Sequence, residues 1–426
     1  MQRRNFLAAG ALSGAALLSG CGGKDSSGNT SGKPEGEITF QYFNNQPAAI
    51  AATKKIVAAF EKKYSGVKVT LQSAPADSLQ EKLKVQYAGG VAPDVVQNDA
   101  PGSTLQYSEY LQELDSLLPK KLVSDIPKSV REGLTKEGKL LAVPTEQQTY
   151  IVFANKSLLK KAGANIPSGE SMTWKTFEEL AKTSTQGGVK GLVWGLNSPT
   201  SVFASLGLGF GATFFTGTEQ DSAEASIGEA ELEVPSRVRT LIEDGYADKT
   251  AVTQSTSDAL PTFYGGKAAM TVAGSYQIAN ITDQAPKGFD WIVLPPLEGS
   301  EGRQQMSAPI TLSIPKTSKN IPTAAAFLEF YQAAANLAKI NIADGEIPAT
   351  TSGQKAAAKE TEGKNGWAEV LDSAKDLVNP TWNTFTNYES WKSTVANPAY
   401  QKYLGGETDE KQLAKELEDG WARVNG

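Results

Sequence analysis

Strand-like and helix-like patterns alternate through the N-terminal quarter of the chain, and this alternation restricts the fold more than any other feature of the sequence. The patterns predict, in order, a strand at 38–43, a helix at 50–64, a strand at 67–71, a helix at 78–88 and a strand at 94–97. Such an order predicts a doubly wound α/β sheet with helices on both faces. Because ligands of these sheets bind beyond the carboxyl ends of strands, we expect a site near the polar loops that contain Asn45, Gln46, Asn98 and Asp99.

A second α/β region begins near residue 150. The run 140–144 looks like a strand that continues into an irregular polar stretch, which contains Gln147 and Gln148, before the apolar run 150–153. Helical patterns follow near 174–183 and 201–210. About 390 residues remain after a polar N-terminal stretch, which is enough for two domains of ordinary size.

The residue types that the chain lacks restrict its chemistry. The sequence has no histidine and one cysteine, Cys21, so Ser-His-Asp catalysis, Cys-His catalysis and ordinary zinc coordination are excluded. We expect no metal and no cofactor. Beyond residue 20 the chain has only five arginines. Because the guanidinium group is the usual clamp for phosphate and carboxylate, a strongly anionic ligand is disfavoured, although lysines and helix N-termini can take that role.

The N-terminal segment has the features of an export signal. Arg3 and Arg4 give it a positive start, and the apolar stretch 6–18 is too short to cross a bilayer as a permanent helix. A buried N-terminal helix is the alternative, but no polar capping residue precedes the stretch. The arginine pair also resembles a twin-arginine signal, which leaves the export route open. We predict a signal peptide at 1–20.

Cys21 is expected to carry a lipid. Ser19 and Gly20 before this cysteine resemble a bacterial lipobox, in which a peptidase cuts before the cysteine and the thiol takes up diacylglycerol. Residues 21–36 are almost all small or polar, so they cannot bury apolar surface and are predicted to form a flexible tether. No second run of eighteen apolar residues occurs, so we expect membrane contact through the lipid alone.

The charge of the chain bears on its partners. The formal net charge is −6, and removal of the two arginines of the signal peptide makes it −8. A mildly acidic chain argues against nucleic acid or anionic lipid as the main partner.

Three stretches of the sequence, taken together, resemble one protein family. They are Tyr-Ala-Gly-Gly-Val-Ala-Pro-Asp-Val-Val at 87–96, Phe-Tyr-Gly-Gly-Lys-Ala-Ala-Met-Thr-Val-Ala-Gly-Ser-Tyr at 263–276, and Leu-Ser-Ile-Pro-Lys-Thr-Ser-Lys-Asn at 312–320 with a helix after it. Their order and spacing, with the lipobox, are similar to those of the maltose-binding-protein-like extracellular solute-binding proteins that serve sugar ABC importers. The resemblance covers the chain from residue 37 to the end.

The resemblance implies a periplasmic binding protein-like fold of type II. Two α/β lobes would be joined by a hinge that the chain crosses three times, near 145–149, 306–310 and 347–351, with a ligand cleft between the lobes. The predicted N-terminal lobe is 37–146 plus 309–349, and the C-terminal lobe is 147–308 plus 350–426. The lobes would close on a ligand and present it to a permease. The implied protein is a monomer that is anchored at the outer face of the cytoplasmic membrane.

A sugar ligand needs aromatic plates and paired hydrogen-bonding groups, because each buried hydroxyl left unpaired costs about 1–3 kcal/mol. The cleft segments that the resemblance implies contain such groups: Asn45, Gln46, Asn98, Asp99, Gln147, Gln148, Ser198, Gly274, Ser275 and Tyr276. The family usually has an aromatic residue, often Trp, where Tyr276 stands. Some relatives have an aromatic residue where Asn98 stands, so this chain lacks a plate on that side.

Four aromatic residues near the C-terminus repeat every three positions: Trp382, Phe385, Tyr388 and Trp391. Core packing is the default interpretation of this spacing. The region also supplies a cleft aromatic in the resembled family, and four large rings exceed what a short helix usually buries. We therefore select Trp382 and Trp391 as candidate ligand plates.

Other functions were weighed against sugar capture. Within the same scaffold, a polyamine, a peptide or a glycerol phosphate can replace the neutral sugar as ligand. A surface-anchored glycoside hydrolase would need paired carboxylates, such as Glu178 and Glu179 or a pair from Glu109, Glu113 and Asp115. Each of these clusters lies on a polar amphipathic stretch, where solvated charge is the simpler explanation. A structural lipoprotein should show repeats, and none is visible. We therefore expect a binding protein and no enzyme.

Overall fold

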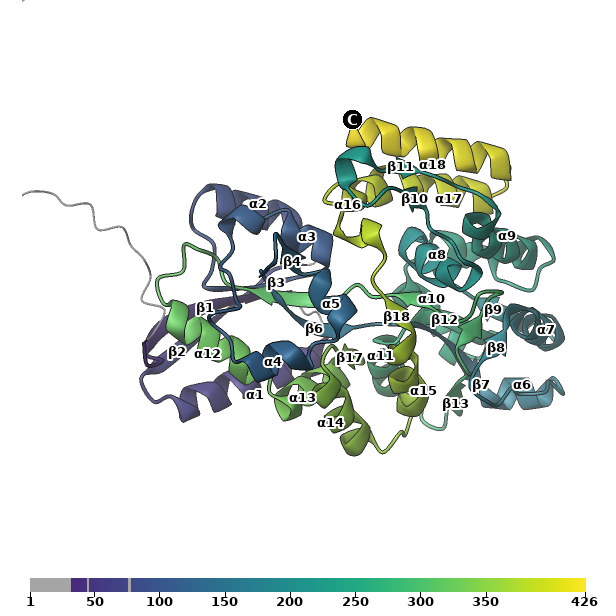
Figure 1. Ribbon diagram of the computed structural model, residues 1–426. Helices are drawn as coiled ribbons and strands as arrows, with labels where there is room; N and C mark the ends of the chain where they lie inside the picture. Colours follow the sequence, from purple (N-terminus) through teal and green to yellow (C-terminus); the bar gives the residue numbers. More distant parts are fainter. Residues whose placement is uncertain (1–31, 44–45, 76–77) are drawn as a thin grey trace, which may run out of the picture.

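The computed structural model describes residues 32–43, 46–75 and 78–426. In this part of the chain two β-sheets, each covered by helices, form two lobes that lie side by side (Figure 1). Cys21, Asn45, the predicted signal peptide and most of the predicted tether lie outside the described residues. Among the described residues, no helix combines the length and the apolar character that a membrane span requires.

The first lobe is built on a six-stranded sheet with the order β17-β6-β16-β3-β1-β2. The strands are β1 (Gly36–Tyr42), β2 (Val67–Ser73), β3 (Val95–Asn98), β6 (Val143–Gln147), β16 (Ile310–Ser313) and β17 (Ile347–Pro348). β1 pairs in parallel with both β2 and β3, and β16 runs antiparallel between β3 and β6. The predicted doubly wound arrangement of the N-terminal region is therefore confirmed.

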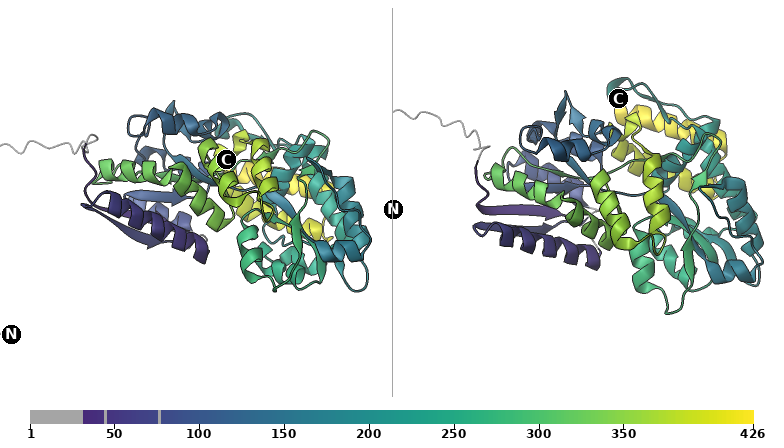
Figure 2. Two further views of the ribbon diagram at one scale, coloured as in Figure 1. Left: turned by 90° about the horizontal axis from the view of Figure 1, so that it is seen from below. Right: turned by 60° about the horizontal axis from the view of Figure 1, so that its bottom comes forward.

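Helices cover this sheet on both faces (Figure 2). They are α1 (Pro47–Lys63), α2 (Leu79–Ala88), α3 (Pro101–Leu105), α4 (Lys120–Asp125), α5 (Lys128–Glu132), α12 (Ile321–Tyr331) and α13 (Ala334–Asp344). Phe40 of β1, Phe60 of α1 and Phe327 of α12 meet in the core, where the Phe327 ring centroid lies 5.2 Å from each of the other two. Segments that are almost 300 residues apart in the sequence thus share one core.

The second lobe is built on a four-stranded sheet with the order β13-β7-β12-β9. The strands are β7 (Tyr150–Asn155), β9 (Lys190–Val193), β12 (Ala268–Gly274) and β13 (Trp291–Val293). β12 pairs in parallel with β9 and antiparallel with β7. Every residue of β12 is buried, as expected for a central strand with both faces covered.

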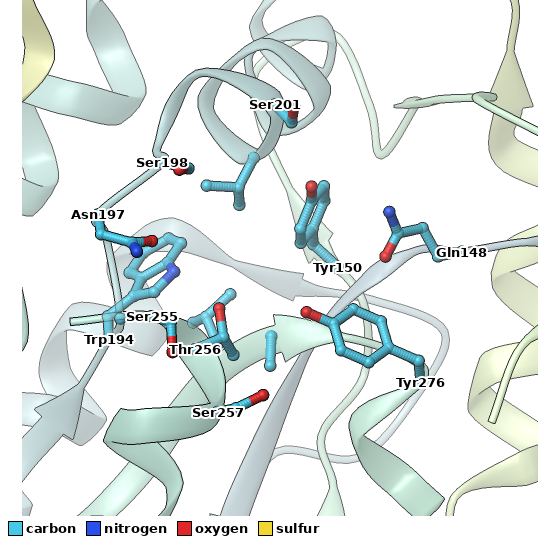
Figure 3. A pocket seen from close by; sticks show the side chains of 14 residues that line it. Gln148, Tyr150, Trp194, Asn197, Ser198, Ser201, Ser255, Thr256, Ser257 and Tyr276 are labelled. Atoms are coloured by element: carbon cyan, nitrogen blue, oxygen red, sulfur yellow. The ribbon is translucent and has the colours of Figure 1, made fainter. Parts of the chain in front are cut away.

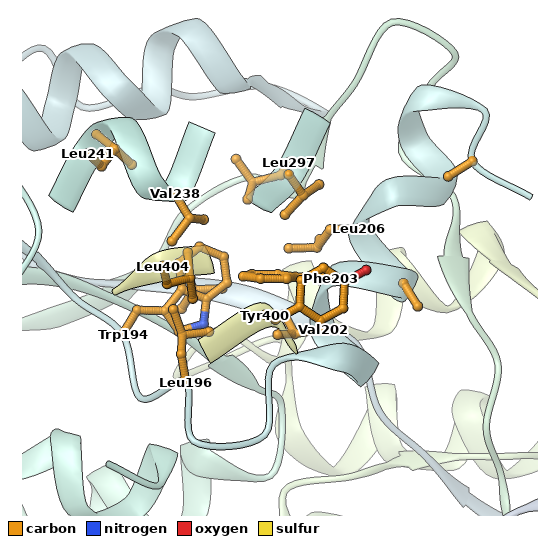
Figure 4. Packing of buried hydrophobic residues seen from close by; sticks show 14 of the residues in the cluster. Trp194, Leu196, Val202, Phe203, Leu206, Val238, Leu241, Leu297, Tyr400 and Leu404 are labelled. Atoms are coloured by element: carbon orange, nitrogen blue, oxygen red, sulfur yellow. The ribbon is translucent and has the colours of Figure 1, made fainter. Parts of the chain in front are cut away.

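The helices of the remaining chain are α6 (Lys156–Lys161), α7 (Trp174–Ser184), α8 (Thr200–Gly207), α9 (Glu229–Glu243), α10 (Thr256–Tyr264), α11 (Gln277–Gln284), α14 (Thr351–Thr361), α15 (Trp367–Ser373), α16 (Tyr388–Trp391), α17 (Asn397–Leu404) and α18 (Glu410–Asn425). Residues of α8 and α17 pack in the largest core cluster, in which the rings of Phe203 and Tyr400 meet edge to face with centroids 5.2 Å apart (Figure 4). Helix α14 packs against α13 and α15. In Figure 1 it lies between the two lobes.

The four C-terminal aromatic residues belong to this core. Their rings surround Phe215, with centroids 5.3 to 6.2 Å from its own. Trp391 is 1% exposed, and its indole nitrogen donates to the carbonyl of Leu417 at 3.0 Å. The three-residue spacing marks a face that packs under α18, because Trp421 of that helix also contacts Phe215. The four residues therefore pack in the core, which is the default interpretation of their spacing.

The chain passes between the lobes at 148–149, between β6 and β7, and again between β15 (Gln305–Met306) and β16. A third connection follows β17 and leads to α14. The first and third connections are tied together, since the backbone N–H of Ala349 donates to the carbonyl of Thr145 at 3.1 Å. The residue limits given above for the two lobes stay a prediction.

Candidate functional site and family

Three strand ends of the second lobe meet at one edge of its sheet. β9 and β12 are parallel, so the residues that follow them, Trp194 and Ser275, lie at the same edge. β7 is antiparallel to β12, and its first residue, Tyr150, pairs with Gly274, the last residue of β12. This edge is the carboxyl end of the parallel pair, which is the place where ligands of α/β sheets bind.

A cavity of about 270 Å³ opens at this edge (Figure 3). Serine and threonine hydroxyls line it at five positions: Ser198, Ser201, Ser255, Thr256 and Ser257. Gln148 and Asn197 add side-chain amides, and the aromatic rings come from Tyr150, Trp194 and Tyr276. None of the described residues that line this first cavity carries a charge.

Two aromatic side chains of the first cavity, Trp194 and Tyr276, are positioned by different parts of the fold. Trp194 is 3% exposed, and its ring meets Phe203 edge to face in the core, so one part of the indole packs inside the lobe while another part faces the cavity. Trp194 and Tyr276 lie on opposite sides of the cavity in Figure 3. Tyr276 follows β12 and begins the turn into α11. Aromatic rings on two sides suit a flat ligand with apolar faces.

Gly274 leaves room for this arrangement. A Cβ atom on Gly274 would lie 2.5 Å from Oε1 of Gln148 and 2.5 Å from Cε1 of Tyr276. Contacts that short do not occur between real side chains, so any larger residue would displace Gln148 or Tyr276. Gly274 thus acts by its small size.

A second cavity of about 220 Å³ lies beside the first and shares Gln148, Tyr150 and Ser201 with it. Both lobes line this second cavity: Asp99 comes from the first, and Tyr388, Glu389 and Lys392 come from the second. The lobes touch next to it. A Cβ atom on Gly102 of α3 would lie 2.9 Å from the carbonyl oxygen of Phe385, so the backbones approach closely there.

Comparison with known proteins places this chain in a family. A model of the bacterial extracellular solute-binding protein family matches residues 44–338. The chain belongs to this family. The family description concerns solute binding rather than catalysis.

Relatives of this solute-binding protein extend over most of its length. An uncharacterized lipoprotein in the oleD 5' region of Streptomyces antibioticus is 31% identical over 398 residues, which is 92% of this chain and 86% of that protein. The multiple sugar-binding protein of Streptococcus mutans is 24% identical over 320 residues, 73% of this chain and 75% of that protein. The predicted family membership is confirmed.

Solved structures agree on the fold. The GacH receptor of Streptomyces glaucescens, whose structure is known without ligand and with acarbose, matches with a TM-score of 0.76 at 22% identity, over 92% of this chain and 99% of that chain. The sugar-binding protein MalE of Xanthomonas citri matches with a TM-score of 0.75 at 18% identity, over 92% and 97%. The predicted periplasmic binding protein-like fold of type II is confirmed.

Part of the residue set predicted for this solute-binding protein lies at the two cavities. Ser198 and Tyr276 line the first cavity, Asp99 lines the second, and Gln148 lines both. Gly274 lies next to Gln148 and Tyr276 and leaves room for their side chains. Contact of these side chains with a ligand stays a prediction.

Other predicted residues point into protein. Asn98 donates to the carbonyl of Ser103 at 2.8 Å and accepts from Gln80, and Gln147 accepts from the Ser307 hydroxyl. Neither Asn98 nor Gln147 lines the first or the second cavity.

Two predicted residues link the lobes. The Gln46 amide donates to the carbonyls of Asp344 at 3.2 Å and Tyr276 at 3.5 Å, and the Ser275 hydroxyl donates to Glu346 at 3.4 Å. Trp382 and Trp391, selected above as ligand plates, lie in the core cluster and line neither cavity, because α18 and Phe215 cover their rings.

Sequence reasoning missed several lining residues. It did not select Trp194, Tyr150, or the 255–257 segment that begins α10. Trp194 had a detectable signal, because it directly follows the short buried strand β9. The helix start had one too, since Ser255 caps α10 by accepting from the Asp258 N–H at 3.1 Å.

Acidic side chains are buried at the hinge of this solute-binding protein. Glu146 of β6 is 0% exposed, Asp344 is the last residue of α13, and Glu346 lies between α13 and β17. Burial, and then the charges of Asp344 and Glu346, raise the pKa of Glu146 well above its usual range. Burial raises the pKa of Asp344 to about 6. The hinge therefore favours the protonated forms of these carboxyl groups more than water does.

Proposed function

We propose that this solute-binding protein is the receptor of an ABC importer and captures an uncharged sugar or oligosaccharide between its lobes. The observation that carries the proposal is the first cavity, which is lined by hydroxyls, amides and aromatic rings and, among the described residues, by no charged side chain. The printed names of relatives support the choice of ligand, since the Streptococcus mutans relative is a multiple sugar-binding protein.

The cavity matches the surface chemistry of a sugar. A pyranose ring has C–H groups on its faces and hydroxyls at its edges. Trp194 and Tyr276 can cover the faces, while Asn197, Gln148 and the serine hydroxyls can pair with the edges. Such pairing matters because a buried hydroxyl without a partner costs about 1–3 kcal/mol. A polyamine or a glycerol phosphate would find no opposite charge in this cavity.

Transport would follow from closure of the lobes. Gln148 and Tyr150 lie at the first connection between the lobes, so a ligand that contacts them would favour one relative position of the lobes. A permease that recognises both lobes would then respond to the loaded protein by population shift. The lipid on Cys21 would keep the exported monomer at the outer face of the cytoplasmic membrane, next to that permease.

A ligand screen tests the proposal. The mature protein is mixed with neutral mono- and oligosaccharides, polyols, polyamines, peptides and glycerol phosphates, and the melting temperature is recorded. A ligand that binds only the folded state raises it, by an amount that grows with concentration over Kd. We expect neutral sugars to raise it. A rise with polyamines, peptides or glycerol phosphates alone would contradict the proposal, as would hydrolysis of the sugar in the same mixture.

Variants of Tyr276 connect the screen to the site. Tyr276→Ala should weaken sugar binding at least tenfold, since it removes a stacking ring, with little change in melting temperature because the ring is only partly buried. Tyr276→Phe keeps the ring and isolates the contribution of the hydroxyl. A large fall in melting temperature with unchanged affinity would show that Tyr276 is a core residue.

A further inference from the structure

The two cavities differ in charge. The first is lined by no charged side chain, whereas Asp99, Glu389 and Lys392 all line the second. The cavities share Gln148, Tyr150 and Ser201, so a ligand longer than one sugar unit can occupy both. Together their volumes fall within the range of about 300–1,000 Å³ that is typical of small-molecule sites.

One negative charge of the second cavity has no partner of opposite charge. Lys392 forms an ion pair with Glu389 on the next turn of the chain. Asp99 accepts a hydrogen bond from the Gln80 amide at 2.9 Å, and no ion pair joins it to a lysine or arginine among residues 32–43, 46–75 and 78–426. Among the described residues that line the second cavity, two carboxyl groups thus face one ammonium group, an excess of one acidic group.

Two further features of the second cavity indicate that it receives a ligand. Tyr388 lines the cavity and is 3% exposed, yet within the described residues its hydroxyl makes no hydrogen bond of ordinary distance and angle. Asp99 is exposed to solvent on one side, but desolvation by the surrounding protein and the nearby charge of Glu389 raise its pKa, and Lys392 only partly opposes them. A buried hydroxyl and a carboxylate that is short of positive charge would both be satisfied by one hydrogen-bonding cation.

We propose that the second cavity binds a protonated amine that belongs to the same ligand as the sugar in the first cavity, so that an amino-substituted saccharide binds more tightly than the uncharged sugar of the proposed function. This inference rests on the proposed function, since it adds a second binding group to the same ligand. Asp99 receives the ammonium group from the side of the first lobe, and Glu389 lies opposite on the second. The amine thereby joins the two lobes.

The order of preference follows from the net charge. A charge-assisted hydrogen bond is roughly twice as strong as a neutral one. A cationic saccharide should therefore bind about tenfold more tightly than its neutral counterpart. An anionic saccharide should bind more weakly than either, because its carboxylate would face Asp99 without a free cation.

The test uses disaccharides that differ only in charge. The probes are β-1,4-linked and α-1,4-linked glucose disaccharides in four forms: unmodified, with 2-amino groups, with 2-acetamido groups, and with a 6-carboxylate. Calorimetric titration of the mature protein gives the Kd of each. We expect the amino form to bind most tightly. Equal Kd values for amino and unmodified forms would overturn the inference and leave the proposed function intact, whereas failure of every form to bind would contradict the proposed function itself.

Two variants should shift the preference in opposite directions. Asp99→Asn removes the unpaired charge, so the ratio of affinities for amino and unmodified forms should fall about tenfold. Lys392→Gln frees Glu389, so the same ratio should rise. The ratio is insensitive to a general loss of binding, and melting temperatures establish that each variant is folded. A ratio that falls in both variants, or changes in neither, would overturn the inference.

Discussion

The side-chain amide of Gln305 forms two hydrogen bonds with the backbone of Tyr150, one in each direction. The N–H of Tyr150 donates to Oε1 of Gln305 at 2.7 Å, and Nε2 of Gln305 donates to the carbonyl of Tyr150 at 2.9 Å. The amide thus pairs with Tyr150 as a neighbouring strand would. Gln305 is 3% exposed and belongs to the segment that returns toward the first lobe. One buried side chain therefore ties a cavity residue to a second connection between the lobes.

Gln305→Ala should weaken both stability and ligand binding. The change leaves the N–H and carbonyl of Tyr150 without partners, which costs about 1–3 kcal/mol for a buried group. Urea unfolding and calorimetric titration measure the two effects. Gln304→Ala is the matched control, since Gln304 is exposed and adjacent, and it should alter neither quantity. Normal affinity in Gln305→Ala would show that Tyr150 does not depend on this clamp.

Gly274→Ala should reduce affinity more than stability. The added methyl group would lie 2.5 Å from both Gln148 and Tyr276, and relief of such overpacking costs about 1–3 kcal/mol. Because both side chains line the first cavity, the displacement falls on the ligand site. Gly66→Ala serves as control, since a methyl group there meets nothing within 4 Å. Unchanged Kd in Gly274→Ala would mean that Tyr276 can move without loss of ligand contact.

Glu146→Gln should stabilise the protein at alkaline pH. The raised pKa of Glu146 means that the unfolded chain, in which a glutamate titrates near pH 4.3, loses this proton first as the pH rises. The protonated Glu146 therefore contributes its full stability below about pH 4.3, and this contribution is lost as the pH rises through the pKa of Glu146 in the folded protein. Glutamine cannot ionise and can still accept from Gln97, so we expect a gain of about 1–3 kcal/mol at pH 8 and no gain at pH 4.

Melting temperatures from pH 4 to pH 8 test this expectation. The exposed Glu179 provides the control, since Glu179→Gln should leave the pH profile unchanged. Parallel profiles for Glu146→Gln and the unmodified protein would mean that Glu146 is not protonated at the hinge. Asp344, whose pKa of about 6 lies inside the same range, and Glu346, whose pKa burial also raises, should keep part of the pH dependence in the variant.

Trp391→Ala distinguishes core packing from ligand contact at the C-terminal aromatic residues. Loss of a fully buried tryptophan costs about 3–5 kcal/mol. We therefore expect a large fall in the free energy of unfolding and little change in Kd at a temperature where the variant is folded. Trp194→Ala should lower the free energy of unfolding and also raise Kd, because Trp194 is part of the core and lines the cavity. Weakened binding with full stability in Trp391→Ala would restore its interpretation as a ligand plate.

Cys21→Ala should release the protein from the membrane without affecting ligand binding. The thiol is the only cysteine of the chain and the predicted site of lipid attachment. Detergent partition and cell fractionation would follow the anchor, and titration would follow the ligand. Retention of the variant at the membrane would contradict lipidation at Cys21.

The main outlines of this protein could be read from its sequence, because they depend on local patterns. The order of strands and helices from residue 38 to 97 predicts the doubly wound sheet, since each element follows from the spacing of its own apolar residues. Three short stretches and a lipobox suffice to indicate the family. The absence of histidine excludes whole classes of catalysis, because such chemistry depends on residue type and needs no knowledge of the fold.

The composition of the site was decided by tertiary structure. Asn98 and Asp99 are adjacent in one polar loop. The Asn98 side chain forms its hydrogen bonds with residues of the first lobe, whereas Asp99 lines the second cavity. The spacing from Trp382 to Trp391 reveals a shared face but not that Phe215 and α18 cover it. A local pattern shows which residues point the same way. What lies opposite them depends on contacts between segments far apart in the chain, and only the folded structure supplies those.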